Sequence, residues 1–150
     1  MSDLLYSKGV LRLAAEAGGA GRLPEPDGTH SEHNPTCGDR STVDLRIDNG
    51  RITAMAHDTK ACVLAQASAS ILGTALPGHT HADLANLRAA VAEMLRGGTE
   101  PAAPFGSYAV LNEVARFPSR HKCVLLPIDA AIGAFEASQA RKPSGQGSEG

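Results

Sequence analysis

The sequence has 150 residues, a length that favours one domain over two. Its formal net charge is −2 and it contains no Trp, so it offers neither the basic face nor the stacking aromatics that nucleic-acid binding needs. No apolar run approaches the roughly 18 residues of a membrane helix, and the N-terminus lacks the pattern of a secretion signal. We therefore expect a cytoplasmic protein with no nucleic-acid and no membrane partner.

The N-terminal part predicts a helix and then a long loop. Residues 3–17 carry a fair apolar stripe with helical spacing, and a Gly-Gly pair would end the helix. The Gly- and Pro-rich segment 18–36 predicts a mobile loop with one short strand near its end.

The next segment predicts a β-hairpin. Residues 42–48 and 51–58 alternate apolar and polar side chains on either side of an Asn-Gly dipeptide, which is typical of a type I′ turn. Strict alternation along the second strand would place Met55 on the face opposite to Ile52 and Ala54.

The second half predicts helices, and the order of elements indicates a single α+β domain: a small antiparallel sheet of about three strands with four to five helices packed on it. The expected helices are residues 62–76, 80–96, 108–116 and 124–140. Pro127 fits the first turn of the last helix, and the small side chains of Ala67–Ser70 would let another backbone approach closely. The domain would cover residues 1–140, and the low-complexity residues 141–150 would form a disordered tail.

Three cysteines lie at the boundaries of these elements. Cys37 precedes the hairpin, Cys62 follows it, and Cys123 lies just before the last helix. Because the outer ends of adjacent antiparallel strands lie side by side, Cys37 and Cys62 should emerge at one edge of the sheet. Asp39, two residues beyond Cys37, should point to the same side. An odd number of widely spaced cysteines favours free thiols in a reducing compartment.

The surroundings of Cys123 favour a thiolate. In the first turn of a helix the macrodipole stabilises that form, and Arg120 and Lys122 act in the same direction. His121 is expected on another face, exposed, and we assign no role to the other five histidines.

The residue types alone leave two interpretations of the cysteines open. Three thiolates and one carboxylate would form a four-coordinate site suited to Zn2+ or iron. A lone cysteine, however, is most often a small buried hydrophobe, and an Asp before a strand is most often a turn residue. A shared metal site and inert thiols are about equally supported at this point.

At these residues the sequence resembles the U-type iron–sulfur assembly family, which includes the IscU scaffolds, the N-terminal domain of NifU, and SufU. The resemblance covers about residues 3–137. The matching pieces stand in the family's order: Asn34-Pro35-Thr36-Cys37-Gly38-Asp39, then Cys62 followed by Ala67-Ser68-Ala69-Ser70, then Arg120-His121-Lys122-Cys123.

Within the family the chain is most similar to the SufU branch. Lys122 stands where IscU scaffolds have His, and the segment 105–117 resembles the insertion that SufU proteins carry before the last cysteine. The LPPVK sequence typical of IscU is absent, and residues 117–120 stand in its place. Ala61 departs from the Gly that the family usually has before the middle cysteine, and it would cost about 1 kcal/mol if that position needed a positive φ.

The resemblance implies a SufE/NifU-like fold and an assembly protein, a scaffold or sulfur acceptor rather than a classical enzyme. It implies a metal bound by Cys37, Asp39, Cys62 and Cys123, with Cys37 accepting persulfide sulfur from a PLP-dependent cysteine desulfurase. In SufU-like proteins the metal is typically zinc. In IscU-like proteins the same ligands hold a nascent [2Fe–2S] cluster, which Asp39 would keep labile for transfer to apo iron–sulfur recipient or carrier proteins.

Three other functions are alternatives to this one. The chain could act as a zinc-dependent sulfurtransferase without cluster scaffolding. A zinc hydrolase is disfavoured, because protein ligands would fill all four positions and no His-Glu-x-x-His motif supplies a base. A metal-free adaptor domain with inert thiols would bind no metal, and its Cys→Ser variants would keep their stability and partner binding.

Overall fold

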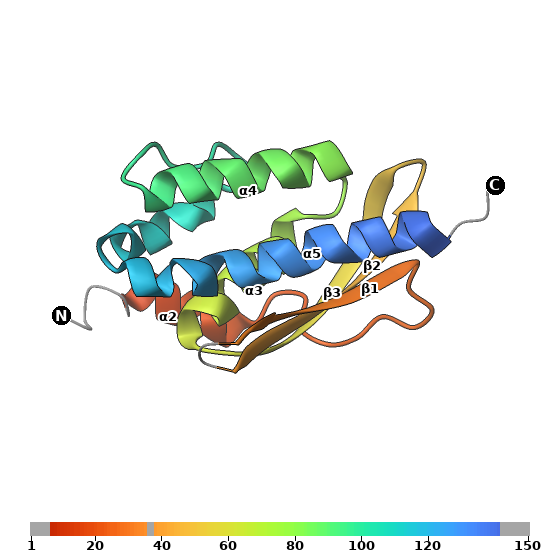
Figure 1. Ribbon diagram of the computed structural model, residues 1–150, viewed down its shortest axis with the longest axis horizontal. Coiled ribbons are helices and arrows are strands. Elements are labelled where there is room, and N and C mark those ends of the chain that lie inside the picture. The colour runs from red at the N-terminus through yellow and green to blue at the C-terminus, as the bar shows by residue number, and fades with distance from the viewer. Residues whose placement is uncertain (1–6, 36–37, 142–150) are drawn as a thin grey trace.

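The Asn-Gly dipeptide closes a hairpin between β2 (Asp39–Asp48) and β3 (Arg51–Lys60). Asn49 and Gly50 both adopt the positive φ that a type I′ turn requires, at 53° and 76°. A third antiparallel strand, β1 (Gly28–Asn34), pairs with β2, giving the order β1-β2-β3. The computed structural model describes residues 7–35 and 38–141, and it confirms the predicted α+β class with its three-stranded sheet (Figure 1).

A β-bulge changes which side chains of β3 face the core. Leu45 pairs with Met55 whereas Ile47 pairs with Ile52, so one extra residue of β3 lies between these pairs. Both Met55 and Ile52 are buried. The expectation that they lie on opposite faces is therefore wrong, because the extra residue reverses the alternation within β3.

The segment expected as a mobile loop is largely fixed to the sheet. Its last part is the seven-residue strand β1, longer than the short strand that was expected. Its first part runs beside the free edge of β3, where the N–H of Gly21 donates to the carbonyl of His57 (2.8 Å) and the N–H of His57 donates to the carbonyl of Gly19 (3.0 Å). The N–H of Asp27 then donates to the carbonyl of Leu45 (2.8 Å).

Helices cover one face of the sheet (Figure 1). α5 lies along β1 and β2, α3 contacts β3, α2 packs on α3, and α4 packs on α5. Two 3₁₀ helices, η1 and η2, precede α5. The bounds are α2 (Lys8–Glu16), α3 (Val63–Ala75), α4 (His81–Leu95), η1 (Gly106–Arg116), η2 (Pro118–Arg120) and α5 (His121–Arg141).

The predicted helix starts are close to the observed ones except for α2 and α5. α4 begins at the expected capping box, in which Thr80 and Asp83 each bond the other's backbone N–H. α2 begins after its N-cap Ser7, whose hydroxyl accepts from the N–H of Val10 (3.3 Å), rather than at residue 3. The part of that expected helix before residue 7, and residues 142–150 of the expected tail, lie outside the described residues.

The position of Pro127 was predicted incorrectly. α5 starts at His121, directly after the 3₁₀ turn of η2, so Pro127 lies in the second turn of the helix rather than the first. A proline there has no N–H for the carbonyl of Cys123, four residues earlier, so one of the hydrogen bonds between these two turns is missing. The residue that marks the start of the helix is Pro118, in η2.

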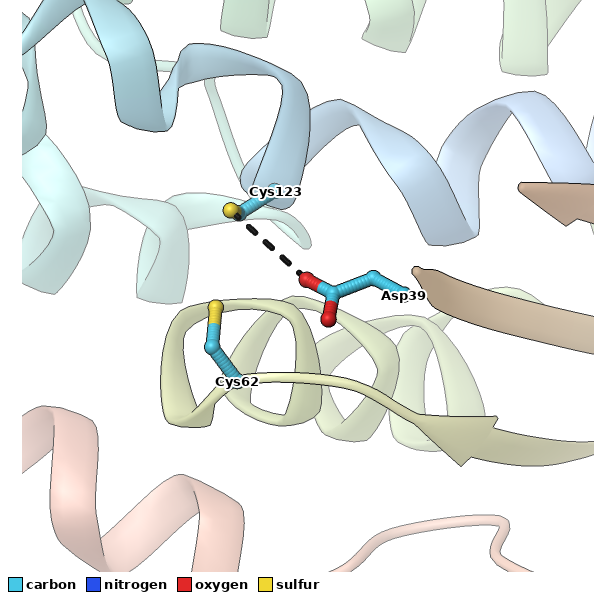
Figure 2. Close-up of side chains that lie close together, drawn as sticks. All are labelled: Asp39, Cys62 and Cys123. Atoms are coloured by element: carbon cyan, nitrogen blue, oxygen red, sulfur yellow. Dashed lines mark hydrogen bonds between the residues drawn. The ribbon is translucent and has the colours of Figure 1, made fainter. Parts of the chain in front are cut away.

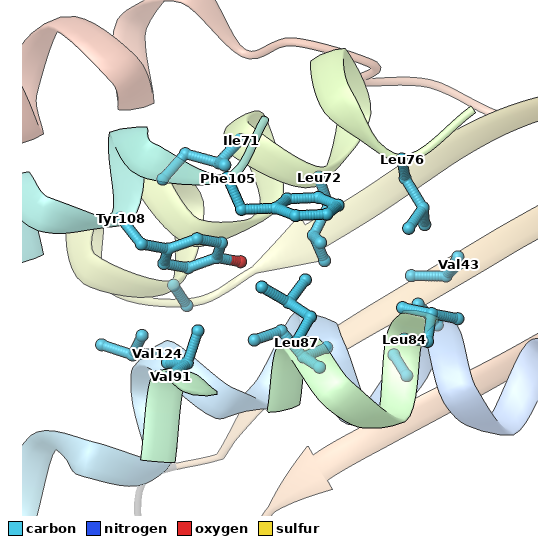
Figure 3. Close-up of a cluster of buried hydrophobic side chains, with 14 of the residues drawn as sticks. Val43, Ile71, Leu72, Leu76, Leu84, Leu87, Val91, Phe105, Tyr108 and Val124 are labelled. Atoms are coloured by element: carbon cyan, nitrogen blue, oxygen red, sulfur yellow. The ribbon is translucent and has the colours of Figure 1, made fainter. Parts of the chain in front are cut away.

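The buried core lies between the sheet and the helices, and extends up to α4 and η1 (Figure 3). By length and composition alone, the stretch Pro118–Ala140 could cross a membrane. It is 56% buried over its most apolar window, against the sheet, α3 and α4, which is the pattern of a core helix.

Candidate metal centre

The outer end of the hairpin brings two of the predicted site residues together. Asp39 is the first residue of β2, and the neighbouring register pair Arg40–Lys60 places the end of β3 alongside it. Cys62 follows β3 by two residues and is the N-cap of α3. Both side chains are half-buried. The strand ends thus bring Asp39 and Cys62 to one edge of the sheet. The expectation that Cys37 meets Cys62 there concerns a residue outside the described part of the chain.

The third residue comes from the other side of the helical layer. Cys123 lies in the first turn of α5, as expected, and is only 3% exposed. Its thiol donates a long hydrogen bond to Oδ2 of Asp39 at 3.9 Å. One ligand atom from each of Asp39, Cys62 and Cys123 lies within 4.8 Å of the others, and Figure 2 shows the three side chains converging from β2, α3 and α5.

This environment favours ionisation of Cys62. A hydrogen bond from the Cys123 thiol is the largest influence that lowers the pKa of Cys62, to about 6. The backbone N–H groups of Ala65 and Leu64 at the start of α3 also favour the thiolate. Burial and the charge of Asp39 oppose this shift and do not cancel it. The pKa of Cys62 thus lies below its ordinary value, so its thiolate is favoured at neutral pH.

The donor set fits a metal cation. The thiol of Cys123 has one proton, but two acceptors face it: the carboxylate of Asp39 and the sulfur of Cys62. One proton cannot satisfy both acceptors, and a metal cation bound between the three groups would. Two soft sulfur ligands and one oxygen ligand suit zinc or iron, and both metals take a fourth ligand in such sites. Within the described parts of the chain, no other group of three His, Cys, Asp or Glu side chains converges in this way.

The fourth predicted ligand, Cys37, lies outside the described residues. The residues on either side of it are fixed near the centre. Asn34 pairs with Asp39 at the end of β1, and the N–H of Gly38 donates to the carbonyl of Asn34 at 2.8 Å. Gly38 has a φ of +76°, which explains why a glycine stands next to Asp39.

The residues predicted to support the centre lie around its edge. Arg120 ends η2, directly before α5. Lys122 is exposed and lines a cavity of about 200 Å³ between β1, α4 and α5, together with Asn34 and Pro35. His121 is half-buried rather than exposed, and its Nε2 lies 3.4 Å from the carbonyl of Ala115, so it does not join the cluster.

Two details of the site could not be settled by sequence reasoning. Ala61 is not among the residues with positive φ, so the departure from the family's glycine causes no backbone strain. Ser68 and Tyr108 were not predicted to have a role, yet their hydroxyls hydrogen-bond each other, and Ser68 donates to the carbonyl of Val124, next to Cys123. The only signal for Ser68 was its place in the small-residue run after Cys62, and Tyr108 carried no signal of its own.

Comparison with known proteins gives consistent matches. The model of the family described as NifU-like N terminal domain matches residues 5–124. A crystal structure of the N-terminal part of a nitrogen-fixing NifU-like protein from Brucella abortus is 32% identical, covers 93% of this chain and 97% of its own, and superimposes with a TM-score of 0.88.

Two curated relatives are similar over shorter stretches. An iron-sulfur cluster assembly scaffold protein IscU from Streptococcus pyogenes serotype M1 is 32% identical over 71% of this chain and 67% of its own. A zinc-dependent sulfurtransferase SufU from Bacillus subtilis is 27% identical over 63% of this chain and 65% of its own.

Proposed function

The chain belongs to the family of NifU-like N-terminal domains, and from that premise we propose that it serves iron–sulfur cluster assembly. It holds a metal ion or a nascent [2Fe–2S] cluster on Cys37, Asp39, Cys62 and Cys123. It accepts persulfide sulfur from a PLP-dependent cysteine desulfurase and passes sulfur or a cluster to apo iron–sulfur recipient or carrier proteins in the cytoplasm. The working domain is residues 1–140.

The observation that carries this proposal is the convergence of Asp39, Cys62 and Cys123, whose ligand atoms lie within 4.8 Å of one another. These residues come from β2, the start of α3 and the first turn of α5, which are distant in sequence, and the fold brings them together. Inert thiols would be expected to lie apart, each within apolar packing.

Cys37 is the sulfur acceptor in this proposal. Its described neighbours Pro35 and Gly38 are exposed, whereas Cys123 is 3% exposed and Cys62 is half-buried. The Cys37 thiolate attacks the outer sulfur of the desulfurase persulfide, a new S–S bond forms on Cys37, and the desulfurase cysteine leaves as a thiolate. The outer sulfur keeps its hydrogen when it is transferred to Cys37. One S–S bond forms as another breaks, so no external oxidant or reductant is needed.

A bound zinc or iron centre would stabilise the thiolate forms of its cysteine ligands. The protein's own contribution is to set how firmly each ligand is held. Cys62 and Cys123 are fixed by the first turns of α3 and α5, whereas Asp39 offers a hard oxygen among soft sulfur donors. Asp39 is therefore the ligand that dissociates most readily when metal or sulfur is handed on.

Zinc-dependent sulfur transfer without scaffolding is the closest variant of this function. The exposed Lys122, standing where IscU scaffolds have His, favours it, as does the similarity to the zinc-dependent sulfurtransferase SufU. Metal content separates the two functions, because bound zinc would indicate sulfur transfer alone and bound iron would indicate cluster scaffolding.

Stimulation of a cysteine desulfurase tests the proposal. The purified protein should raise the rate at which a desulfurase releases alanine from cysteine, and Cys37→Ser should abolish this effect. Glu93→Gln, at an exposed ion pair on α4, is the matched control and should stimulate like the wild type. Equal stimulation by Cys37→Ser and the wild type would contradict the assignment of Cys37 as acceptor.

A further inference from the structure

A buried hydrogen-bond network links the two helices that carry Cys62 and Cys123. Ser68, in the second turn of α3, donates from its Oγ to the carbonyl of Val124 in α5 at 2.7 Å. The Oγ of Ser68 also lies 2.8 Å from the hydroxyl of Tyr108 in η1. Ser68 and Tyr108 are both 0% exposed, and Tyr108 lies in the same apolar cluster as Val124 (Figure 3).

The direction of each bond follows from the protons available. The single proton of the Ser68 hydroxyl goes to Val124, so Tyr108 is the donor in the contact with Ser68 Oγ. Its hydroxyl also lies 3.2 Å from the carbonyl of Ser68. Complete burial raises the pKa of Tyr108, which keeps this donor protonated. The chain of bonds therefore runs from Tyr108 through Ser68 to the backbone beside Cys123.

The bond from Ser68 adds to the support that α5 gives to its own first turn. Pro127 cannot donate to the carbonyl of Cys123, so the helix itself holds the turn that carries the cysteine less firmly than an ordinary helix would. The bond from Ser68 to Val124 attaches this turn to α3, whose N-cap is Cys62. The separation of the two sulfur atoms thus depends on a contact six residues along α3 from Cys62.

We propose that Ser68 and Tyr108 are positioning residues of the metal centre, which hold the Cys123 turn at the distance from Cys62 that a shared metal requires. This inference rests on the proposed function. It gives a role to two sequence features that the ligand set leaves unexplained: the small-residue run Ala67–Ser70 and the inserted segment 105–117, which supplies Tyr108.

The chain contains a matched control for Ser68. Ser70 lies two residues further along the same helix, is 1% exposed, and accepts a hydrogen bond from the N–H of Gly18 at 2.9 Å. Ser68→Ala and Ser70→Ala therefore each remove one buried hydroxyl from α3. Ser68→Ala loses the bonds to Val124 and Tyr108, and Ser70→Ala loses the bond from Gly18. Only Ser68 contacts the turn that carries Cys123.

Binding of Co2+ to the reduced protein provides the readout, because its visible ligand-field bands report both affinity and geometry. We expect Ser68→Ala to weaken Co2+ binding by about tenfold and to alter the bands, as loss of an outer-sphere contact does at other metal sites. Ser70→Ala should change affinity by less than about twofold. Thermal unfolding of the metal-free variants, measured with a chelator, gives the stability that each loses, so that the loss of Co2+ affinity can be compared at known stability.

Tyr108→Phe gives a second variant that keeps the buried ring. If the hydroxyls act as one network, it should weaken Co2+ binding by itself, and the double variant with Ser68→Ala should lose less than the product of the two single effects. It also keeps the inference testable should Ser68→Ala fail to fold.

The outcomes separate this inference from the function on which it rests. A wild-type protein that binds no Co2+ would overturn the proposed metal centre and this inference with it. A wild type that binds Co2+, with affinities and bands unchanged in Ser68→Ala and Tyr108→Phe, would overturn only the positioning role.

Discussion

At the scale of single residues, the carboxylate of Asp44 in β2 holds the segment before β1 against the sheet. Asp44 is 1% exposed and accepts from Nε and Nη2 of Arg22, from the N–H of Leu23 and from the hydroxyl of Thr29, at 2.7–3.1 Å. Burial alone would raise the pKa of Asp44, but these hydrogen bonds and the charge of Arg22 lower it below its usual value. The ionised carboxylate is therefore what the fold requires.

Asp44→Asn should lower the free energy of unfolding by about 2 kcal/mol, because the charge that pairs with Arg22 is lost and an amide NH₂ then faces an N–H donor of Arg22. Urea denaturation at neutral pH measures this loss. Glu93→Gln is the control, since Glu93 forms an exposed pair with Arg96 and should change stability by less than about 0.5 kcal/mol. A loss for Asp44→Asn no larger than that of the control would contradict this account.

A second buried polar residue, His57, is neutral in the folded protein. Its Nε2 lies 2.9 Å from the carbonyl of Gly18 and its Nδ1 lies 3.0 Å from the hydroxyl of Thr59. Burial lowers the pKa of His57, and the carbonyl of Gly18 and the charge of Asp58 only partly oppose this. When the pH falls far enough to protonate this histidine in the unfolded chain, the folded state, which disfavours the proton, becomes less stable relative to the unfolded state.

The pH dependence of stability follows from the lowered pKa of His57 in the folded protein. The contribution of His57 should be complete above about pH 6.5, the ordinary value for histidine, and should be lost as the pH falls below it. Urea denaturation of the reduced, metal-free protein between pH 5 and pH 7 should show stability rising with pH, with a smaller slope in His57→Gln. His33→Gln, at an exposed position, should keep the wild-type slope. Equal slopes in all three proteins would contradict a neutral buried His57.

At the scale of elements, the contact between α2 and α3 depends on the absence of side chains. A Cβ on Gly73 would lie 2.0 Å from the carbonyl oxygen of Gly18, and Ser70 accepts from the N–H of the same residue. The small residues Ala67–Ser70 are all buried here. The approaching backbone is Gly18, just after α2, and it is Gly73 that leaves room for it. Of the run that was expected to allow a close approach, Ser70 is the residue that lies beside Gly18.

Gly73→Ala should destabilise the protein by about 1–3 kcal/mol, because the methyl group can fit only if the backbone at Gly18 moves. Thermal or urea unfolding measures the change. Gly106→Ala is the matched control, since nothing lies within 4 Å of a Cβ there, and it should stay within about 0.5 kcal/mol of the wild type. Equal stability of the two variants would show that α2 does not pack as closely as described.

At the scale of the whole molecule, features that depend on neighbouring residues could be predicted from the sequence. The hairpin, the capping box of α4 and the meeting of Asp39 with Cys62 at one sheet edge all follow from local patterns and antiparallel pairing. The convergence of Cys123 on that edge was implied only by the family resemblance, because it depends on how α5 crosses the sheet.

Features set by distant contacts could not be predicted. The bulge that places Met55 on the same face as Ile52 depends on the pairing of β3 with β2, and the burial of Asp44 depends on Leu23, 21 residues earlier. Pro127 was taken as the mark of a helix start because a proline inside a helix is normally unfavourable. Tertiary packing of α5 outweighs that local preference.

The central claim is that Asp39, Cys62 and Cys123, with Cys37, form a metal centre. The most direct test is elemental analysis and a visible spectrum of protein purified without oxygen, alongside Cys62→Ser and Cys123→Ser. The account predicts about one zinc per chain with no visible absorption, or iron with labile sulfide and charge-transfer bands, and loss of the metal in both variants. Freshly reduced wild-type protein that contains neither metal would contradict it.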